Sequence, residues 1–339
     1  MPLEPRLLSI GAHLPGALIT NEELAPRLRT SAEEVARRTG IARRHHAPAG
    51  EGPSDLARRA ADDALRRSGT EVSDLALIVF ATATPDVTFP GSACYLQDKL
   101  GADTVGALDV RAQSAGFLAA LDLALALSGG TSAFRAPASG ETRILVAAGE
   151  VFSTGLDESP SGADLTPRLA DGAAAAVVGP GEAGSHVRAL RWYSDGTLAD
   201  RFWCEYPASR QYPLRVTAEN LAAGLHYPKA DFAALAPIVE KRLFTAMREV
   251  LELAGWSAGS VEAAFVDYVE PPVARAAASA AGLASERVDV PTERFGHVMA
   301  AGLPIRFEQR YGELAPGARV LLAAAGPGVT WGAAAIEIG

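Results

Sequence analysis

A serine, a histidine and an aspartate, far apart in the chain, are of residue types that could do chemistry together. They are Ser114, His297 and Asp267. A serine hydroxyl is a weak nucleophile near neutral pH, so it needs a base such as histidine within hydrogen-bond reach. A carboxylate can hold that imidazole in the required tautomer and stabilise its charged form. The three residue types can therefore form a nucleophile–base–orienter triad.

Residue type alone does not single out these three side chains. A serine at the start of a helix, as predicted for Ser114, is most often an N-cap. His297 follows a glycine, a setting in which a lone histidine is usually a surface or packing residue. Asp267 lies in an apolar run, where an unpaired carboxylate is expensive to bury, so its ordinary interpretation is a satisfied structural carboxylate.

The elements that would carry these residues alternate along the chain. Short apolar runs flanked by Gly, Pro or Asp predict buried strands at 75–83, 143–148, 173–178, 264–269, 319–325 and 332–338. Helical patterns lie between them, at 54–68, 114–127, 232–254 and 304–311. The alternation predicts a layered α/β fold. Residues 132–141 are expected to form an exposed loop.

The order of helix, strand, glycine turn and strand occurs twice. After Ser114 come ILVAAGE and GAAAAVVGPG, and after His297 come VLLAAAGPG and GAAAIEIG. We interpret this echo as the duplication of one α/β unit. The turn-rich stretch at 179–184 is the expected boundary. It would divide the chain into an N-terminal half, 1–179, with Ser114, and a C-terminal half, 180–339, with Asp267 and His297.

Composition narrows the class of protein. A chain of 339 residues with 48% hydrophobic content can bury a large core in one large or two medium domains. A net charge of −9 argues against non-specific nucleic-acid binding. No apolar run reaches the roughly 18 residues of a membrane span, and the N-terminus is a poor signal peptide, so a cytoplasmic enzyme without membrane association is expected. Two cysteines predict neither a disulfide framework nor a metal site.

Five motifs, in order and at matching spacing, resemble the β-ketoacyl-acyl-carrier-protein synthase III family of the thiolase superfamily. They are TSAEEVARRTGIARR at 30–44, FPGSACYLQDKLG at 89–101, DVRAQSAGFLAAL at 109–121, DG at 171–172 and GVTWG at 328–332. The resemblance covers nearly the whole chain. It implies a thiolase-like fold, in which a duplicated unit builds five layers in the order αβαβα.

The resemblance breaks at the family's catalytic positions. The nucleophilic cysteine of the family falls on Ser114, and His297 takes the position of an asparagine in a G-N-T segment. Counting back from Gly282 without gaps puts Asp267 at the position of the family's histidine. We interpret the change as the exchange of one working constellation for another, in a divergent serine-nucleophile branch.

A rival alignment affects only the third of these positions. It matches Pro271 to the family's proline and Pro272 to its histidine, but needs a five-residue deletion in the following helix. The gapless alignment is preferred for that reason. Glu270 is the reserve candidate for the carboxylate.

The resemblance also implies where a tetrahedral oxyanion would be stabilised. In the family the nucleophile sits at the N-terminus of a buried helix, where free N–H groups favour negative charge. A second donor comes from the glycine-rich loop before T-W-G. Here that loop reads GPG, and Pro327 has no N–H. Either the N–H of Gly326 or that of Gly328 would supply the second donor, or the oxyanion would be stabilised less strongly.

Substrate-binding residues are carried over in the same way. Arg38 matches a family arginine that faces the nucleotide of coenzyme A, although the adenine-stacking tryptophan of the family is replaced by Glu34. Phe89 matches a residue that crosses the dimer interface, so the resemblance implies a homodimer. Cys94 is an alternative nucleophile by type, but its segment matches a non-catalytic part of the family, and a buried side chain is expected.

The leading hypothesis is an acyltransferase. Ser114 would take an acyl group from a thioester of coenzyme A or a carrier protein and pass it to a hydroxyl, an amine or a carrier-protein thiol. The resemblance implies polyketide or other secondary metabolism, with no permanently bound cofactor. One alternative is a starter-unit synthase that condenses an acyl-CoA with malonyl-carrier protein. Another is an inactive subunit that shapes a partner's pocket.

Overall fold

Two mixed sheets of five strands form the body of the protein in this computed structural model, which describes residues 4–128, 142–211 and 213–339. In order across the first sheet, the strands are β1 (Pro5–His13), β7 (Gly172–Pro180), β6 (Arg143–Glu150), β4 (Leu75–Ala81) and β5 (Gly106–Val110). Those of the second are β12 (Val288–Asp289), β11 (Ala263–Asp267), β13 (Arg319–Gly326), β14 (Thr330–Glu337) and β8 (His186–Ser194). The loop predicted at 132–141 lies outside the described residues.

The two sheets repeat one pairing scheme. In the first, β4 is parallel to β5 and β6, while β7 is antiparallel to β6 and β1. In the second, β11 is parallel to β12 and β13, while β14 is antiparallel to β13 and β8. The predicted duplication is confirmed at the level of the sheets. The exact division after residue 179 stays a prediction.

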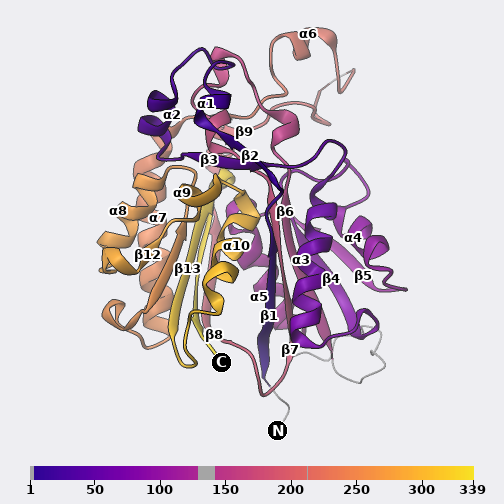
Figure 1. The fold of residues 1–339 in the computed structure, drawn as a ribbon, viewed down its shortest axis with the longest axis vertical. Coiled ribbons are helices and arrows are strands. Elements are labelled where there is room, and N and C mark those ends of the chain that lie inside the picture. The colour runs from indigo at the N-terminus through magenta and orange to yellow at the C-terminus, as the bar shows by residue number, and fades with distance from the viewer. Residues whose placement is uncertain (1–3, 129–141, 212) are drawn as a thin grey trace.

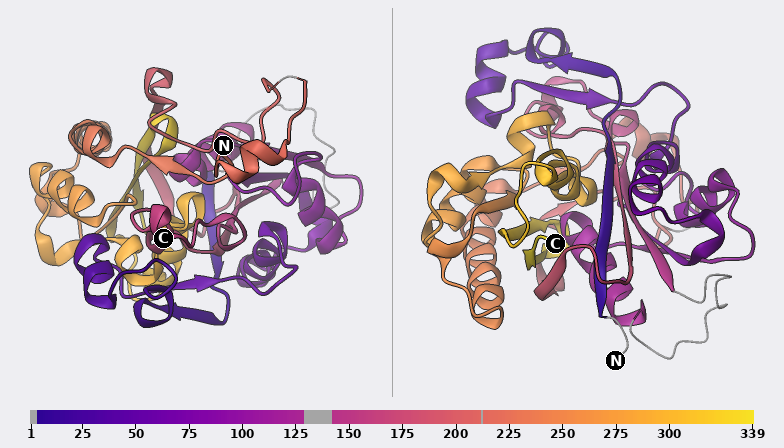
Figure 2. Two further views of the ribbon diagram at one scale, coloured as in Figure 1. Left: turned by 90° about the horizontal axis from the view of Figure 1, so that it is seen from above. Right: turned by 60° about the horizontal axis from the view of Figure 1, so that its bottom comes forward.

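Helices complete the five layers (Figures 1 and 2). Two of them, α5 (Gly116–Ser128) and α10 (Met299–Tyr311), lie between the sheets and contact strands of both. On the outer flank of the first sheet lie α3 (Pro53–Ser68) and α4 (Ser92–Leu100). On the outer flank of the second lie α7 (Phe232–Leu253) and α8 (Pro271–Ala280). The arrangement is the predicted αβαβα order.

Smaller elements gather at one end of the layers (Figure 1). They are α1 (Asn21–Leu24), α2 (Ala32–Thr39), α6 (Ala218–Ala222), α9 (Pro291–Phe295) and two short sheets, formed by β2 (Ala17–Thr20) with β3 (Arg43–His46) and by β9 (Phe202–Trp203) with β10 (Lys229–Ala230). Arg43 and Arg44, the last residues of the motif at 30–44, begin β3.

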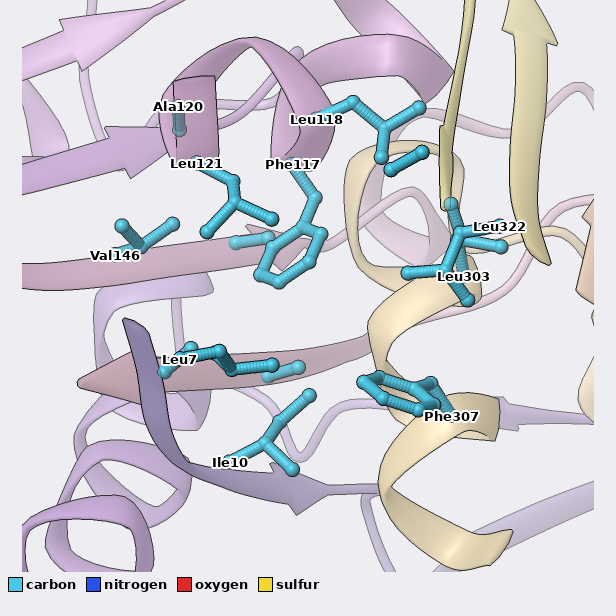
Figure 3. Close-up of a cluster of buried hydrophobic side chains, with 14 of the residues drawn as sticks. Leu7, Ile10, Phe117, Leu118, Ala120, Leu121, Val146, Leu303, Phe307 and Leu322 are labelled. Carbon is cyan, nitrogen blue, oxygen red and sulfur yellow. The ribbon is translucent and has the colours of Figure 1, made fainter. Parts of the chain in front are cut away.

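The largest apolar cluster joins the central helices to the sheets. Phe117 of α5 and Leu303 of α10 point into it, with Ile10 of β1 and Leu322 of β13 (Figure 3). All four are at most 1% exposed. Burying a large apolar side chain contributes about 1.5–3 kcal/mol, so this cluster fixes the two central helices against both sheets. Because α5 and α10 are positioned together, so are the residues at their N-terminal ends.

Candidate active site

Ser114 lies at the entrance to the central helix α5. A short 3₁₀ turn, Gln113–Ala115, runs directly into the helix, and the Ser114 side chain is completely buried. Gln113 has φ +51°, the left-handed region that residues other than glycine seldom adopt. A Cβ on Gly116 would stand 3.1 Å from the Cβ atoms of Ala81 and Ala300, so a side chain there would crowd the turn. The predicted position at a buried helix N-terminus is confirmed.

His297 lies at the corresponding end of the other central helix, between α9 and α10. Its main chain pairs with a segment of the first half: its N–H donates to the carbonyl of Arg168 at 2.7 Å, and its carbonyl accepts from the N–H of Ala170 at 3.0 Å. The side chain is 1% exposed. The pairing leaves rotation of the ring as the main freedom of this residue.

The two side chains meet at hydrogen-bond distance. The Oγ atom of Ser114 lies 3.1 Å from Nε2 of His297. The residues are 183 positions apart in sequence and come from opposite halves of the fold. This is the geometry in which an imidazole can accept the proton of a hydroxyl.

Asp267 completes the set, although it does not bind the ring directly. It ends strand β11 and is completely buried, with Oδ2 at 3.5 Å from Nδ1 of His297. The hydroxyl of Thr292 lies between them, 2.7 Å from Oδ1 of Asp267 and 3.0 Å from Nδ1 of His297. Sequence reasoning missed Thr292, because the second residue of a short helix carries no mark of this contact. Asp267, the residue that the gapless alignment selects, therefore lies beside His297, while the alignment itself stays a prediction.

Gly326 packs directly against the serine. A Cβ placed on it would lie 2.4 Å from Oγ and 2.8 Å from the main-chain nitrogen of Ser114, so no side chain fits there. Gly328 has φ +126°, a conformation that side chains disfavour. Both predicted glycines therefore border the site. Which N–H faces a bound oxyanion stays a prediction.

Two adjoining cavities lead toward the side chains of Ser114, His297 and Asp267. The nearer, about 330 Å³, is bordered by Gln113, Met299 and Gly328, close neighbours of Ser114, His297 and Gly326. The second, about 590 Å³, shares Ala83, Phe152, Cys204 and Pro228 with the first. Together they provide space for a substrate beside the buried serine.

The predicted substrate-binding residues, Arg38 and Phe89, are not joined to the side chains of Ser114, His297 and Asp267. Arg38 is ion-paired with Glu34 and, at 3.0 Å, with Asp164. Hydrogen bonds from Arg37 and then Arg38 lower the pKa of Glu34 to about 2. The Arg38 guanidinium would therefore have to exchange a carboxylate for a phosphate. Phe89 is 77% exposed, which leaves it available to a partner.

The other predicted residues lie apart from the site. Burial raises the pKa of Glu270, the reserve carboxylate, above its usual value, although Arg168 opposes the rise. No hydrogen bond links Glu270 to His297 within the described residues. The prediction that Cys94 is buried is wrong. It lies on the solvent side of α4 because the inward positions of that helix are taken by Ala93 and Leu96.

The described residues contain no group of three or more His, Cys, Asp or Glu placed to hold a metal ion. Nor does any described helix have both the length and the apolar character needed to cross a membrane.

Known proteins resemble this chain over almost its whole length. Residues 108–196 match the family model for 3-oxoacyl-[acyl-carrier-protein] synthase III, and residues 251–338 match the model for its C-terminal part. The β-ketoacyl-[acyl-carrier-protein] synthase III of Methylococcus capsulatus is 32% identical, over 98% of each chain. That of Rhizorhabdus wittichii is 34% identical, again over 98% of each.

Solved structures of proteins with the same name support this relationship. The crystal structure of 3-oxoacyl-[acyl-carrier-protein] synthase III from Aquifex aeolicus superposes with a TM-score of 0.83 at 28% identity, covering 98% of this chain and 99% of that one. The thiolase-like fold is thereby confirmed. The priming β-ketosynthase of the R1128 polyketide pathway, 24% identical, shares the fold and shows nothing further. The chain belongs to the β-ketoacyl-acyl-carrier-protein synthase III family.

Proposed function

We propose that this protein is an acyltransferase that carries its acyl group on Ser114. The observation behind the proposal is the distance of 3.1 Å between Oγ of Ser114 and Nε2 of His297, at the N-terminus of a buried helix. A serine in the position of the family's cysteine would be inert without a base. The hydrogen-bonded imidazole supports acylation of the serine.

The proposed reaction has two transfers. His297 takes the proton from Ser114 as Oγ attacks the carbonyl carbon of a thioester of coenzyme A or a carrier protein. The C–S bond then breaks, and the imidazolium returns its proton to the departing thiolate. In the second transfer, His297 takes a proton from the acceptor, which attacks the acyl-serine. The bond to Oγ breaks, and Ser114 regains its hydrogen from the imidazolium.

Two candidate functions differ in the molecule that accepts the acyl group from Ser114. Transfer to a hydroxyl, an amine or a carrier-protein thiol requires only the base just described. Condensation with malonyl-carrier protein, as a starter-unit synthase, is the second candidate, and the names of the relatives support it more directly than they support transfer. Against condensation stands Asp267: an ionised carboxylate cannot donate a hydrogen bond to the malonyl oxygen that gains charge. His297 would have to assist decarboxylation alone.

The remaining features of the proposal come from the family resemblance. A homodimer in which Phe89 reaches the partner's acyl pocket is supported by the exposure of that ring. A setting in polyketide or secondary metabolism is part of the proposal. An inactive pocket-shaping subunit is the least supported candidate, because a buried Ser–His pair with a nearby carboxylate is an elaborate arrangement to retain without use.

Intact-protein mass spectrometry after exposure to a panel of acyl-CoAs tests the acyl-enzyme. We expect one added acyl mass on the wild-type protein and none on Ser114→Ala. The matched control is Cys94→Ala combined with Cys204→Ala, because Cys94 is exposed and Cys204 borders both cavities. This double variant should acylate normally. Acylation that follows the cysteines instead would overturn the assignment.

A second measurement separates the two candidates. The acylated protein is mixed with malonyl-carrier protein whose free carboxyl group is labelled. Release of labelled carbon dioxide with a 3-oxoacyl product would identify a condensing enzyme. Retention of the label, with transfer of the acyl group to an added hydroxyl, amine or carrier-protein thiol, would identify the acyltransferase.

A further inference from the structure

Thr292 stands between the imidazole of His297 and the carboxylate of Asp267. It is the second residue of α9, and its side chain is completely buried. Its Oγ1 lies 3.0 Å from Nδ1 of His297 and 2.7 Å from Oδ1 of Asp267. The other carboxylate oxygen, Oδ2, lies 3.5 Å from Nδ1 and has no hydrogen-bond partner among the described residues. The ring is therefore bound by the hydroxyl and only approached by the carboxylate.

Counting hydrogens fixes the direction of these bonds. A threonine hydroxyl has one hydrogen to donate, and an ionised carboxylate can only accept. With Asp267 ionised, Thr292 therefore donates to Asp267 and accepts from Nδ1–H of His297. If Thr292 donated to Nδ1 instead, two acceptor oxygens would face each other at 2.7 Å without a hydrogen between them. Such a contact is costly in a buried site.

The direction of the bonds determines the tautomer of His297. With its hydrogen on Nδ1, the neutral ring presents a lone pair at Nε2, the atom 3.1 Å from Oγ of Ser114. With its hydrogen on Nε2, the ring could not accept the serine proton. Because the main chain of His297 is fixed by Arg168 and Ala170, the contacts of the ring nitrogens decide how the ring is held.

We propose that Thr292 is a positioning residue that selects the Nδ1–H tautomer of His297 and so makes this histidine a base toward Ser114. The inference rests on the proposed acylation of Ser114. When His297 takes the serine proton, the hydrogen on Nδ1 stays in its bond to Thr292. Asp267 then stabilises the positive ring through Oδ2, without itself gaining a proton.

Two substitutions at one position test the role of the hydroxyl. Thr292→Val keeps the branched shape and removes the hydroxyl, whereas Thr292→Ser keeps the hydroxyl and removes a methyl group. The rate of acyl-Ser114 formation is measured by rapid quenching and intact mass. We expect a fall of about 10²-fold for the valine variant, below the ~10⁴-fold cost of a fully wrong tautomer in serine proteases. The serine variant should stay within about threefold of the wild type.

A spectroscopic measurement separates this role from a merely structural one. In protein labelled with ¹⁵N-histidine, a ring nitrogen without hydrogen resonates far from one that carries hydrogen, and the spectrum of His297→Gln identifies the signals of His297. Wild type and Thr292→Ser should show an unprotonated Nε2 at a pH where the ring is neutral. Thr292→Val should show a substantial population protonated at Nε2.

The two readouts keep this inference separate from the proposed function. If the protein never acylates Ser114, the proposed function is wrong. The ¹⁵N spectra would still show whether Thr292 selects the tautomer of His297. Wild-type acylation and tautomer in Thr292→Val would show that Asp267 orients the ring directly, and would overturn the inference. So would an Nε2–H tautomer in the wild type. Thr292→Ala serves the same comparison if the valine variant fails to fold.

Discussion

Glu150 and Asp267 each end a buried strand, one in each sheet, and neither side chain is exposed. Glu150 accepts hydrogen bonds from the N–H groups of Ala83 and Thr84, from the Thr84 hydroxyl at 2.7 Å and from the N–H of Ala300 at 3.3 Å. Asp267 accepts one, from Thr292, and its second oxygen has no partner within the described residues.

The difference separates two uses of a buried carboxylate. Donors from two segments, the loop at residues 83–84 and Ala300, surround Glu150, so its carboxyl group holds that loop and the start of α10 against strand β6. Asp267 keeps an oxygen free beside His297, at a cost in stability, since unpaired buried polar atoms cost about 1–3 kcal/mol. A charge left incompletely satisfied next to a base retains the capacity to stabilise a cation that forms there. We therefore expect the two residues to respond in opposite ways to substitution.

The largest expected effect is on activity. Asp267→Asn should lower the rate of Ser114 acylation by about 10³- to 10⁴-fold. Its amide NH₂ can donate to Thr292, which would then turn its own hydrogen toward Nδ1 of His297 and leave Nε2 protonated. Glu150→Gln should keep the rate within about tenfold. A comparable loss in both variants would erase the distinction. The measurement is single-turnover acylation at saturating acyl-CoA.

Stability should show the reverse order. Glu150→Ala leaves several buried N–H groups without an acceptor, and we expect the free energy of unfolding to fall by about 3 kcal/mol or more. Asp267→Asn should change it by less than about 1 kcal/mol, because the wild-type carboxylate is only partly satisfied. Denaturant unfolding of both variants beside the wild type measures the difference. Equal losses would contradict the comparison.

The pH dependence of stability sharpens the role of Glu150. Burial raises the pKa of this carboxyl to about 7 from its usual 4.5, although its hydrogen bonds oppose the rise. The folded protein thus favours the protonated form. Its contribution to stability is complete below pH 4.5 and is lost as the pH rises through about 7, by about 3 kcal/mol in all.

Glu150→Gln removes that titration and serves as the reference. The difference in unfolding free energy between this variant and the wild type should shift in favour of the variant as the pH rises from about 4.5 to 8. Other titrating groups are common to both proteins and cancel. A difference that does not change with pH would show that Glu150 stays ionised throughout.

A smaller effect is expected at the unpaired oxygen of Asp267. A Cβ on Gly302 of α10 would lie 2.8 Å from Oδ2, so Gly302→Ala should displace the carboxylate and lower the acylation rate about tenfold. The matched control is Gly312→Ala at the end of the same helix, where a Cβ would meet nothing within 4 Å. If the two variants acylate equally well, the position of Oδ2 does not matter to the reaction.

Much of the fold was predictable because its central strands are uninterrupted apolar runs in the sequence. The run at 75–83 becomes β4 and that at 319–325 becomes β13, each within two residues of the predicted ends. Strands β5 and β8 were not predicted, because they lie at sheet edges: no residue of β5 is buried, and β8 mixes exposed with buried positions. The helix expected at 304–311 begins at Met299, five residues early, because Pro304 is accommodated inside it.

The site was predictable only through the resemblance. Ser114 and His297 fall on positions that the family uses, and the structure brings them together. The proximity of Asp267 to His297 followed from a gapless count rather than from any property of the apolar run around it. Thr292 could not be found in this way, because its contact depends on how α9 is oriented against β11, and no local pattern encodes that orientation.

The pairing of the His297 main chain with residues 168–170 ties the histidine to the half of the molecule that supplies the serine. Loosening of the packing between the sheets, by heat or denaturant, that breaks these two hydrogen bonds also separates the imidazole from the hydroxyl. Reactivity at Ser114 should therefore act as an early reporter of this opening. It should disappear while the helical circular dichroism of the protein is still intact.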